Sequence, residues 1–387
     1  MQIVMVGPFG FHPNKTMRAR AFQLARPLVQ RGHQVTMIMP PWQTPAEAGR
    51  IWREEGVTIN YVSLQGGVPG ITRRMVRAAL AARPGVVHCF KPKAYSGLVA
   101  WWLWQFRRHR LRLVVDSDDW EGWGGWNELA PYSPAQKHFF AWQERWGMGH
   151  CHSLTVASRA LQSLAWAQGV PPAQVIYLPN GPGIDPDAGG AAARRAALGL
   201  ATRPVLLLYS RLFEFDIGRL IAVLQQVHAA LPNLAILAVG AGLYAADAAQ
   251  LRQQLATAGL LDCFVDVGWL PEGELPAALA AADAGLYLME DTLLNRTKCP
   301  VKLADMLAVG VPVVAEAVGQ VPEYVQPGQT GLLCPSGDVA GLAASLVHLL
   351  TDDAQRRRLG AGAQAHVAAN FAWARLAERL EVAYGAG

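Results

Sequence analysis

The sequence between residues 298 and 314 reads Lys298-Cys299-Pro300-Val301-Lys302-Leu303-Ala304-Asp305-Met306-Leu307-Ala308-Val309-Gly310-Val311-Pro312-Val313-Val314. Its first part predicts a short helix with Lys302 and Asp305 on one face, because residues three apart are neighbours on a helix. A glycine turn and a β-branched run then predict a buried strand. The glycine loop that follows, 319–325, opens another helix. Such a unit brings a carboxylate and a helix N-terminus to the carboxyl edge of a parallel sheet, where α/β proteins hold nucleotides.

Strand and helix patterns alternate along both halves of the chain. In the first half, a helical pattern at 16–30 follows the first of the strand patterns, which lie at 3–6, 34–39, 57–62, 85–89, 112–116 and 153–157. The second half has strand patterns at 204–209, 234–239, 263–265, 284–288 and 311–315, and closes with helical patterns at 339–350, 354–366 and 371–384. This alternation predicts parallel, doubly wound sheets. The turn-rich segment 178–186 is the predicted linker.

Composition narrows the class of protein. A chain of 387 residues is long enough for two domains or more, and its 52% hydrophobic and 16% charged residues exclude a disordered chain. No apolar run reaches the roughly 20 residues of a bilayer span, and residues 1–7 read as a buried strand, not as a signal peptide. Reduced thiols in a cytosolic protein are expected, because the cysteines are scattered without paired metal spacing: Cys89, Cys151, Cys263, Cys299 and Cys334.

The order and spacing of the elements after residue 204 resemble the donor-binding half of retaining GT-B glycosyltransferases, in the large group 1 family (family 4-like). The resemblance implies an α/β protein with two Rossmann-like, doubly wound domains facing a cleft. It implies an acceptor-side domain at 1–182, a nucleotide-sugar donor domain at 183–368, and a C-terminal helix at 369–387 that returns to the first domain. The implied activity moves a hexose or related sugar from a nucleotide-sugar to an acceptor hydroxyl with retention, in cell-envelope, glycolipid or polysaccharide synthesis. No cofactor is expected, because the nucleotide-sugar is a substrate.

The resemblance implies that the nucleotide-sugar donor binds mainly to the second half of the chain. Arg211 follows the first strand there, where the family has an arginine that contacts the diphosphate, and an arginine's planar fork suits two phosphate oxygens. Asp305 stands where the family has the glutamate that binds the ribose, and a carboxylate can accept from two hydroxyls. Arg211 and Lys302 are expected to stabilise the departing diphosphate. The remaining predicted donor-binding residues are Gly10, Gly240, Gly242, Lys298, Gly319 and Val321.

Two positions depart from the family pattern. Asp216 stands where the family usually has a lysine, and an acidic side chain there would repel a diphosphate. Arg219, Lys298 or Lys302 would have to supply the missing charge, and we favour Lys302. Thr297 stands where the first glutamate of the family's two-glutamate motif would touch the donor sugar. This leaves the donor sugar open, as the nucleotide base and the acceptor also are.

A dense cluster of acidic and aromatic residues follows the strand pattern at 112–116 and reads Asp116-Ser117-Asp118-Asp119-Trp120-Glu121-Gly122-Trp123. Many relatives carry a histidine where Asp118 stands, near the donor sugar. Asp118 is therefore predicted to be catalytic, either hydrogen-bonding a sugar hydroxyl or acting on the acceptor hydroxyl. Asp119 and Trp120 are predicted on the acceptor side, because tryptophan faces suit sugars, although simple packing is the other explanation for the tryptophans. The basic residues Lys15 and Arg18 complete the predicted acceptor side.

The pair Asp116 and Asp118 also mimics the metal-binding Asp-x-Asp of the other glycosyltransferase fold. GT-B enzymes use backbone dipoles and basic side chains in place of a metal, so the resemblance implies no metal. Two other functions stay open. One is a nucleotide-sugar epimerase of the same fold, and the other is a non-catalytic relative that binds a sugar nucleotide or a glycan.

Residues 101–112 set an aromatic run beside a basic cluster. With Arg73, Arg74, Arg77 and a pI near 9.0, this stretch suits peripheral contact with anionic lipid at the inner face of a membrane. A buried aromatic helix followed by a solvated turn explains it equally well. Nucleic acid is not expected as a partner, because no recognised binding module accompanies the basic residues.

Overall fold

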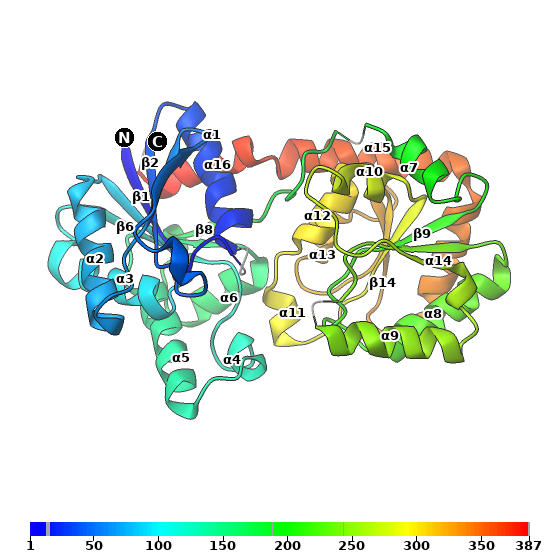
Figure 1. Cartoon of the computed structure of the whole chain (residues 1–387), viewed down its shortest axis with the longest axis horizontal. Helices are drawn as coiled ribbons and strands as arrows, with labels where there is room; N and C mark the ends of the chain where they lie inside the picture. The colour runs from blue at the N-terminus through cyan, green and yellow to red at the C-terminus, as the bar shows by residue number, and fades with distance from the viewer. Residues whose placement is uncertain (13–15, 188, 243, 386–387) are drawn as a thin grey trace. The chain divides into compact units, whose positions relative to one another are not determined.

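The computed structural model describes residues 1–12, 16–187, 189–242 and 244–385, and divides the chain into two compact units (Figure 1). Unit 1 comprises Met1–Asn180, Thr297–Cys299 and Trp373–Gly387, and unit 2 comprises Gly181–Arg296 and Pro300–Ala372. Each unit has its own sheet and its own core. In the residues described, no helix is both long and apolar enough to cross a bilayer.

The sheet of unit 1 has the strand order β3-β4-β2-β1-β5-β6-β7-β8. Its strands are β1 (Gln2–Val6), β2 (Gln34–Met39), β3 (Ile51–Glu54), β4 (Val57–Tyr61), β5 (Val86–Phe90), β6 (Arg112–Ser117), β7 (Ser153–Val156) and β8 (Val175–Tyr177). All neighbours pair in parallel except β3, which runs antiparallel to β4. The edge strands β3 and β8 were not predicted. The predicted parallel, doubly wound architecture is confirmed.

Helices cover both faces of this sheet. One face carries α2 (Gly67–Ala81), α3 (Ala94–Arg107), α5 (Pro134–Gly149) and α6 (Arg159–Ala167), and the other carries η1 (Met17–Phe22), α1 (Gln23–Gln30) and α16 (Trp373–Ala383). The predicted return of the C-terminal helix is confirmed, because Leu376 and Leu380 of α16 are buried in the core beside α1. Shorter helical segments are η2 (Pro45–Glu47), α4 (Trp126–Leu129) and η3 (Pro172–Gln174).

The predicted helix at 16–30 starts as a π-helix, η1, before it continues as α1. A π-helical turn is rare and often marks a functional position, because it changes the direction of one side chain relative to the rest of the helix. Here the turn contains Arg20, whose side chain is almost completely buried.

The sheet of unit 2 has the order β11-β10-β9-β12-β13-β14, and all of its strands are parallel. They are β9 (Val205–Leu208), β10 (Ala235–Ala238), β11 (Phe264–Asp266), β12 (Ala284–Tyr287), β13 (Val313–Glu316) and β14 (Gly331–Cys334). The helical segments are α7 (Ala191–Ala197), α8 (Ile217–Ala230), α9 (Ala245–Thr257), η4 (Leu261–Cys263), α10 (Leu275–Ala280), α11 (Leu293–Thr297), α12 (Val301–Ala308), α13 (Val321–Tyr324), α14 (Val339–Thr351) and α15 (Asp353–Asn370). Strand β14 was not predicted.

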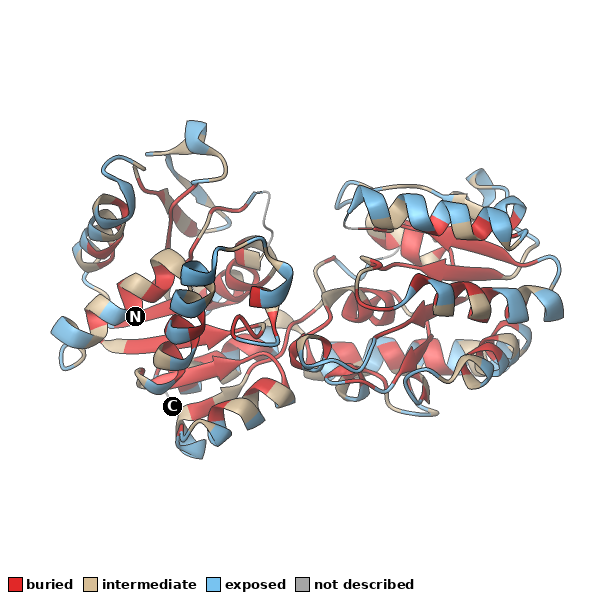
Figure 2. Ribbon diagram, turned by 90° about the horizontal axis from the view of Figure 1, so that it is seen from below, coloured by how far each residue is buried: buried red, intermediate tan, exposed pale blue. Residues whose placement is uncertain are grey.

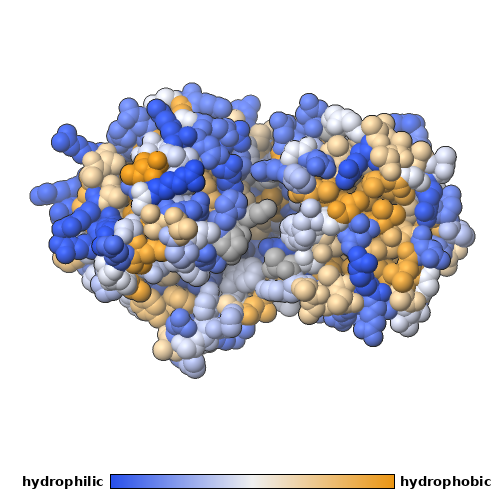
Figure 3. Space-filling view, viewed as in Figure 1, coloured by the Kyte–Doolittle hydropathy of each residue, from blue (hydrophilic) through white to orange (hydrophobic). Residues whose placement is uncertain are grey.

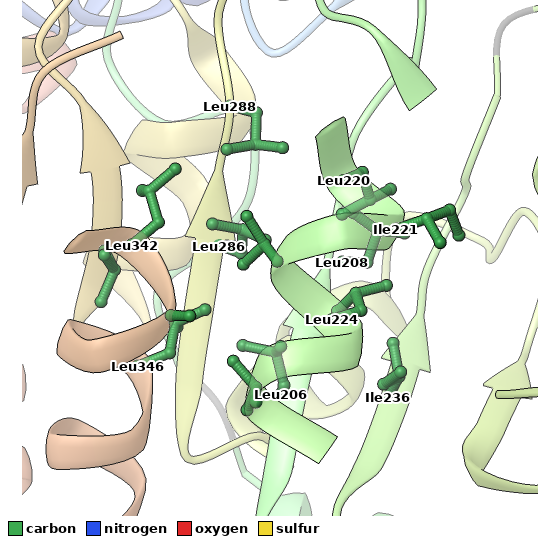
Figure 4. Packing of buried hydrophobic residues seen from close by; sticks show 14 of the residues in the cluster. Leu206, Leu208, Leu220, Ile221, Leu224, Ile236, Leu286, Leu288, Leu342 and Leu346 are labelled. Atoms are coloured by element: carbon green, nitrogen blue, oxygen red, sulfur yellow. The ribbon is translucent and has the colours of Figure 1, made fainter. Parts of the chain in front are cut away.

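The core of unit 2 lies between its strands and the helices α8 and α14. Figure 4 shows Leu206 and Leu286 of the central strands packed between Leu224 of α8 and Leu346 of α14. All four side chains are at most 1% exposed. The strands are buried while the outer faces of the helices are exposed, as Figure 2 shows for both units. Burial on both faces explains why these strands are continuous apolar runs.

The surface differs in character from the core. On the face shown in Figure 3, hydrophilic side chains cover much of unit 1, and unit 2 shows larger hydrophobic areas among its polar residues. All five cysteines are buried, and none of them forms a disulfide.

Candidate active site

Three of the predicted donor residues of unit 2, Lys302, Gly240 and Gly242, lie at the carboxyl ends of β9 and β10. Lys302 on α12 donates from Nζ to the carbonyl oxygen of Gly240 at 3.2 Å, just after β10. The same ammonium lies 3.9 Å from the ring centroid of Tyr209 and 5.2 Å from that of Trp269. Gly240 and Gly242 both have positive φ, 51° and 84°, which favours glycine. The structure therefore brings Lys302 and the Gly-x-Gly turn together.

Asp305 lies one turn after Lys302 on α12, but its side chain is almost completely buried. Its Oδ1 accepts from the Gly183 amide at 2.6 Å, and its Oδ2 accepts from the Tyr209 hydroxyl at 3.2 Å. Burial raises the pKa of Asp305 to about 7, although both hydrogen bonds and the nearby Lys302 oppose the rise. The carboxylate thus joins α12 to the segment around Gly183. Its contact with a ribose stays a prediction.

Arg211 follows β9, as predicted, and pairs with a buried acid. Its Nη2 lies 2.6 Å from Oε1 of Glu214, and its guanidinium carbon lies 5.2 Å from the ring centroid of Phe213. The Arg211 side chain keeps 35% of its surface exposed, whereas that of Glu214 keeps 2%. Arg211 is therefore held in place by Glu214 while part of its cationic group faces solvent.

Asp216 has a structural role that its place in the family pattern did not suggest. It is the N-cap of α8, and its Oδ1 accepts from the Arg219 amide at 2.8 Å. An aspartate at this position satisfies an amide that the helix itself leaves unpaired. Arg219 in turn pairs with Glu316 at 3.3 Å. Of the three cations considered as substitutes for the family's lysine, Lys302 is the one at the Gly240 turn.

Sequence reasoning missed Glu316, at the end of β13. Its fully buried carboxylate accepts from the amides of Met289 and Gly337, both at 2.7 Å, and from Arg219. It thereby ties together the loops that follow β12 and β14. An acidic residue closing the apolar run Val313–Glu316 was the available sequence signal, because a charge at the end of a buried strand requires partners.

The loop from Gly319 to Val321 contains two of the predicted donor residues. Gly319 has φ of 54°, and a Cβ there would lie 2.6 Å from the backbone of Arg296, so the position requires glycine. The Val321 amide, however, already donates to the Val318 carbonyl at 3.1 Å. Donor binding by Val321 stays a prediction. Lys298 belongs to unit 1, where its ammonium lies 5.2 Å from the ring centroid of Trp126.

In unit 1, the acidic cluster after β6 surrounds a buried lysine at the end of β5. Lys91 Nζ lies 3.1 Å from Asp118 Oδ1, 3.2 Å from Asp119 Oδ2 and 2.9 Å from Glu121 Oε1. Lys91 has φ of 48°, a strained backbone conformation for a residue with a side chain. Burial raises the pKa of Asp118 to about 7, Lys91 opposes that rise, and Asp119 adds to it. A carboxyl with such a pKa can exchange a proton near neutral pH.

Asp116 is held by Arg20, a second residue that sequence reasoning missed. The Arg20 guanidinium donates to both carboxylate oxygens, at 2.8 and 2.7 Å, and the Thr155 hydroxyl donates to Asp116 at 2.6 Å. Both charged side chains are 98% or more buried. Arg20 also donates to Asn180 at 2.8 Å. The Asp-x-Asp pair thus faces two cations of the protein, Arg20 and Lys91.

The structure places the predicted acceptor-side residues in different surroundings. Trp120 is only 7% exposed and lies in the core beneath the sheet, so the expectation that its ring is presented to a sugar is wrong. Its indole donates to the Trp123 carbonyl at 2.7 Å, which turns the ring inward. Arg18 pairs with Glu54 at 2.5 Å. Asp119 faces Lys91, as described above. Lys15 lies outside the described residues.

Gly10 lies close to Tyr61. A Cβ at Gly10 would approach the Tyr61 hydroxyl to 2.9 Å, and that hydroxyl accepts from the Phe11 amide at 2.7 Å. The Tyr61 side chain therefore leaves room only for a glycine at position 10. In the described residues, no group of three or more His, Cys, Asp or Glu side chains is arranged to hold a metal ion.

Comparisons with known proteins agree with this architecture. Residues 15–181 match the model of the glycosyl transferase 4-like domain, and residues 203–352 match that of the glycosyl transferases group 1. The GDP-mannose-dependent alpha-(1-6)-phosphatidylinositol monomannoside mannosyltransferase of Mycolicibacterium smegmatis is 30% identical over 59% of the chain and 61% of its own length. The phosphatidyl-myo-inositol mannosyltransferase of Mycobacterium leprae is 25% identical over 99% of the chain and 96% of its own length.

Solved structures show the same fold. The HepE protein of Anabaena in complex with UDP has a TM-score of 0.75 at 17% identity and is covered completely, as is this chain. The sucrose-phosphate synthase of Thermosynechococcus elongatus has a TM-score of 0.72 at 22% identity, over 100% of this chain and 99% of its own. The chain spans about half to three fifths of the length of the mannosyltransferases that it matches at 30% identity or more. The two family models and the two parallel sheets together show that the chain belongs to the glycosyltransferases of the GT-B fold, with a 4-like domain followed by a group 1 domain.

Proposed function

We propose that the protein transfers a sugar from a nucleotide-sugar to an acceptor hydroxyl with retention of configuration. The observation that carries this proposal is the match of both units, in chain order, to the two halves of a glycosyltransferase. The match also favours transfer over the epimerase considered from the sequence. A relative that binds sugar nucleotides without transfer is separated from a transferase by the release experiment described at the end of the Discussion.

The donor diphosphate binds unit 2 in this proposal. Lys302 and Arg211 are the cations at the carboxyl ends of β10 and β9, and each is held by a neighbour, Gly240 and Glu214 respectively. Fixed cations stabilise the charge that develops on a departing diphosphate without having to reorganise during the reaction. Support therefore comes from two positioned cations beside a glycine turn that lets backbone approach the ligand closely.

GDP-mannose is the donor that we propose to test first. Relatives from Mycolicibacterium smegmatis and Corynebacterium glutamicum are named for dependence on GDP-mannose, whereas a solved structure of the same fold holds UDP. Unfolding temperatures of the protein with GDP, UDP and ADP, and with their sugars, rank the bases directly, because a ligand that binds only the folded state stabilises it.

The acceptor is proposed to be a lipid-linked or glycan hydroxyl. Several relatives are named for phosphatidylinositol mannosides, which are membrane lipids. We propose that Asp118 serves this reaction as the carboxyl that accepts the acceptor's proton or orients a sugar hydroxyl. Its support is a buried position beside Lys91 and a pKa of about 7. Contact with the inner face of a cell membrane is part of the same proposal.

No metal or other cofactor takes part in the proposed reaction. Asp116 accepts two hydrogen bonds from Arg20, and Asp118 forms an ion pair with Lys91 at 3.1 Å, so cations of the protein already face both carboxylates. The charge of the diphosphate would be met by Arg211 and Lys302, which is the role that a divalent ion otherwise plays.

A further inference from the structure

Three neighbouring helices on one face of the unit 1 sheet carry an unusual set of charges. Helix α2 packs against α3, and α3 packs against α5. Together the three helices, all within the described residues, include a single acidic residue, Glu144, and it is completely buried. Their outer side, which we name the basic aromatic layer, therefore carries positive charges only. Figure 1 shows α2, α3 and α5 along one side of unit 1.

The cations of this layer lie at the solvent-facing side of the helices. Arg107, Arg108 and Arg110 form the end of α3 and the turn that follows it, and Arg145 on α5 is exposed. Arg107 and Arg108 lie over the rings of Trp102 and Trp104, at 5.4 and 5.7 Å from their centroids. Such stacking leaves the positive charge in place. Arg73, Arg74 and Arg77 on α2 add three more cations to the same layer.

Large aromatic side chains lie exposed among these cations. Trp101 and Phe106 on α3 are 37% and 55% exposed, and Phe139 and Trp142 on α5 are 38% and 44% exposed. Folded proteins usually bury such residues, and an exposed group of them marks a surface that binds something. Aromatic residues beside arginines are typical of the interface between a membrane and water.

The aromatic side chains of α5 lie next to one another along the helix. The rings of Phe139, Trp142, Trp146 and His150 follow one another with centroids 5.7, 6.1 and 4.4 Å apart, and their planes differ by 23°, 32° and 6°. His150 also lies 6.0 Å from Trp104 of α3, with the two ring planes nearly perpendicular at 89°. Aromatic side chains of this kind, tryptophan above all, are enriched at the interface between a membrane and water.

We propose that the basic aromatic layer docks unit 1 onto a bilayer that contains anionic lipid. The charge complementarity identifies the partner, because a layer without exposed acids is attracted by an anionic surface and not by a neutral one. The exposed rings supply apolar contact at the depth of the headgroups. This inference deepens the membrane contact in the proposed function by naming its surface, and it does not depend on the transfer reaction.

The test uses the full chain and lipid vesicles, with no donor or acceptor present. Vesicles of phosphatidylcholine alone are compared with vesicles that contain about 30% phosphatidylglycerol, because charge attraction is the proposed cause. We expect sedimentation with the anionic vesicles at low salt, at least about tenfold weaker binding to the neutral ones, and weakening as salt is raised. Equal binding to both vesicle types would overturn the proposal.

Matched variants distinguish binding through the basic aromatic layer from binding through the overall positive charge of the protein. The variant R107Q/R108Q/R110Q should bind anionic vesicles at least about tenfold more weakly, since each cation near an anionic surface contributes about a fivefold gain. The control R252Q/R357Q/R358Q removes three exposed arginines from unit 2 and should change binding less than about twofold. Equal losses in the two variants would contradict the assignment. Unfolding temperatures within about 2 °C of wild type show that the variants are folded.

A second pair of variants tests the rings. F139S/W142S should lose binding to anionic vesicles, while W269S, which removes a tryptophan 60% exposed in unit 2, should keep it. The wild type could bind neither vesicle type while soluble dextran slows its migration. If F139S/W142S then abolishes this slowing, the layer binds glycan and the lipid proposal is wrong. Failure of vesicle binding leaves nucleotide binding by unit 2 unaffected, so the two proposals fail separately.

Discussion

The ammonium of Lys91 lies 3.1 Å from Oδ1 of Asp118, and both side chains are at most 8% exposed. Lys91 sits at the end of β5 in a strained conformation, and Asp118 follows β6, so two adjacent strands fix the pair. Asp119 and Glu121 also face Lys91, at 3.2 and 2.9 Å. Burial favours a neutral Asp118, and Lys91 favours a charged one, which leaves the pKa of Asp118 at about 7.

Replacing Lys91 by Met should move the pH dependence of the reaction. Loss of the cation raises the pKa of Asp118 further, so the charged carboxylate forms only at higher pH. The acidic limb of kcat/KM should therefore shift to higher pH, because that limb reports the free enzyme's base. Lys91→Arg keeps the charge and should restore most of the wild-type limb. An unchanged limb in Lys91→Met would show that Asp118 is not the group that titrates.

Asp118→Asn should lower kcat by about 100-fold or more, if the carboxylate accepts the acceptor's proton. Affinity for the free nucleotide should stay nearly intact, because the residue lies in unit 1 and the proposed phosphate contacts lie in unit 2. Steady-state kinetics and calorimetry of nucleotide binding measure the two effects. Full turnover in Asp118→Asn would rule out the catalytic role.

Arg211→Ala and Lys302→Met should each weaken binding of a nucleoside diphosphate about tenfold or more, because a hydrogen bond to a charged group contributes about 1.5–3 kcal/mol. Binding of the bare nucleoside should change little, since the lost contacts are to phosphate. Arg252→Gln removes an exposed arginine of the same unit and serves as the control. Equal losses for the diphosphate and the nucleoside would contradict the assignment of both cations.

Asp305→Asn should change how stability depends on pH. Burial raises the pKa of Asp305 to about 7 in the folded protein, above its ordinary value of about 3.9. Between these values the unfolded chain releases the proton that the folded chain keeps, so this residue's contribution to stability falls as pH rises. Asparagine has no such proton. The wild type should therefore lose stability relative to Asp305→Asn between about pH 4 and pH 7. Urea unfolding across this range checks the sign, and a constant difference would show that the carboxyl does not titrate as described.

Activity should survive chelation by EDTA. Arg20 and Lys91 already face Asp116 and Asp118, so removal of divalent ions should leave the proposed reaction intact. Activity assays before and after EDTA treatment, with added manganese as the control, measure this. Loss of activity with EDTA and its return with manganese would support the Asp-Ser-Asp metal hypothesis instead.

The local patterns of the sequence predicted most of the fold. Long apolar runs such as Val205–Leu208 and Val313–Glu316 are buried on both faces, and their helices alternate with them regularly. The edge strands β3 and β8 were missed, because they are short and carry partly exposed residues that lack a clear apolar pattern. Lys302 and the Gly240 turn were assigned to the donor separately, and the structure shows that they are in contact.

The paired charges could not be predicted in the same way. Arg20 and Asp116 are 96 residues apart, and their contact depends on a π-helical turn that no sequence pattern announces. Trp120 was expected on the surface with its acidic neighbours, but the glycines at 122 and 125 leave space for its ring and the chain folds it inward. The N-cap role of Asp216 was readable, because an aspartate directly before an apolar helical pattern is a helix-start signal.

Release of nucleoside diphosphate from a nucleotide-sugar is the most direct test of the proposed activity. The protein is incubated with GDP-mannose, and with UDP-glucose, in the presence and absence of phosphatidylinositol or its mannosides. We expect diphosphate release that depends on acceptor, with a product whose anomeric configuration by NMR matches that of the donor. Inversion of the donor sugar at another carbon without release would identify an epimerase. Tight nucleotide binding without release, across donors and acceptors that include a membrane lipid extract, would contradict glycosyl transfer.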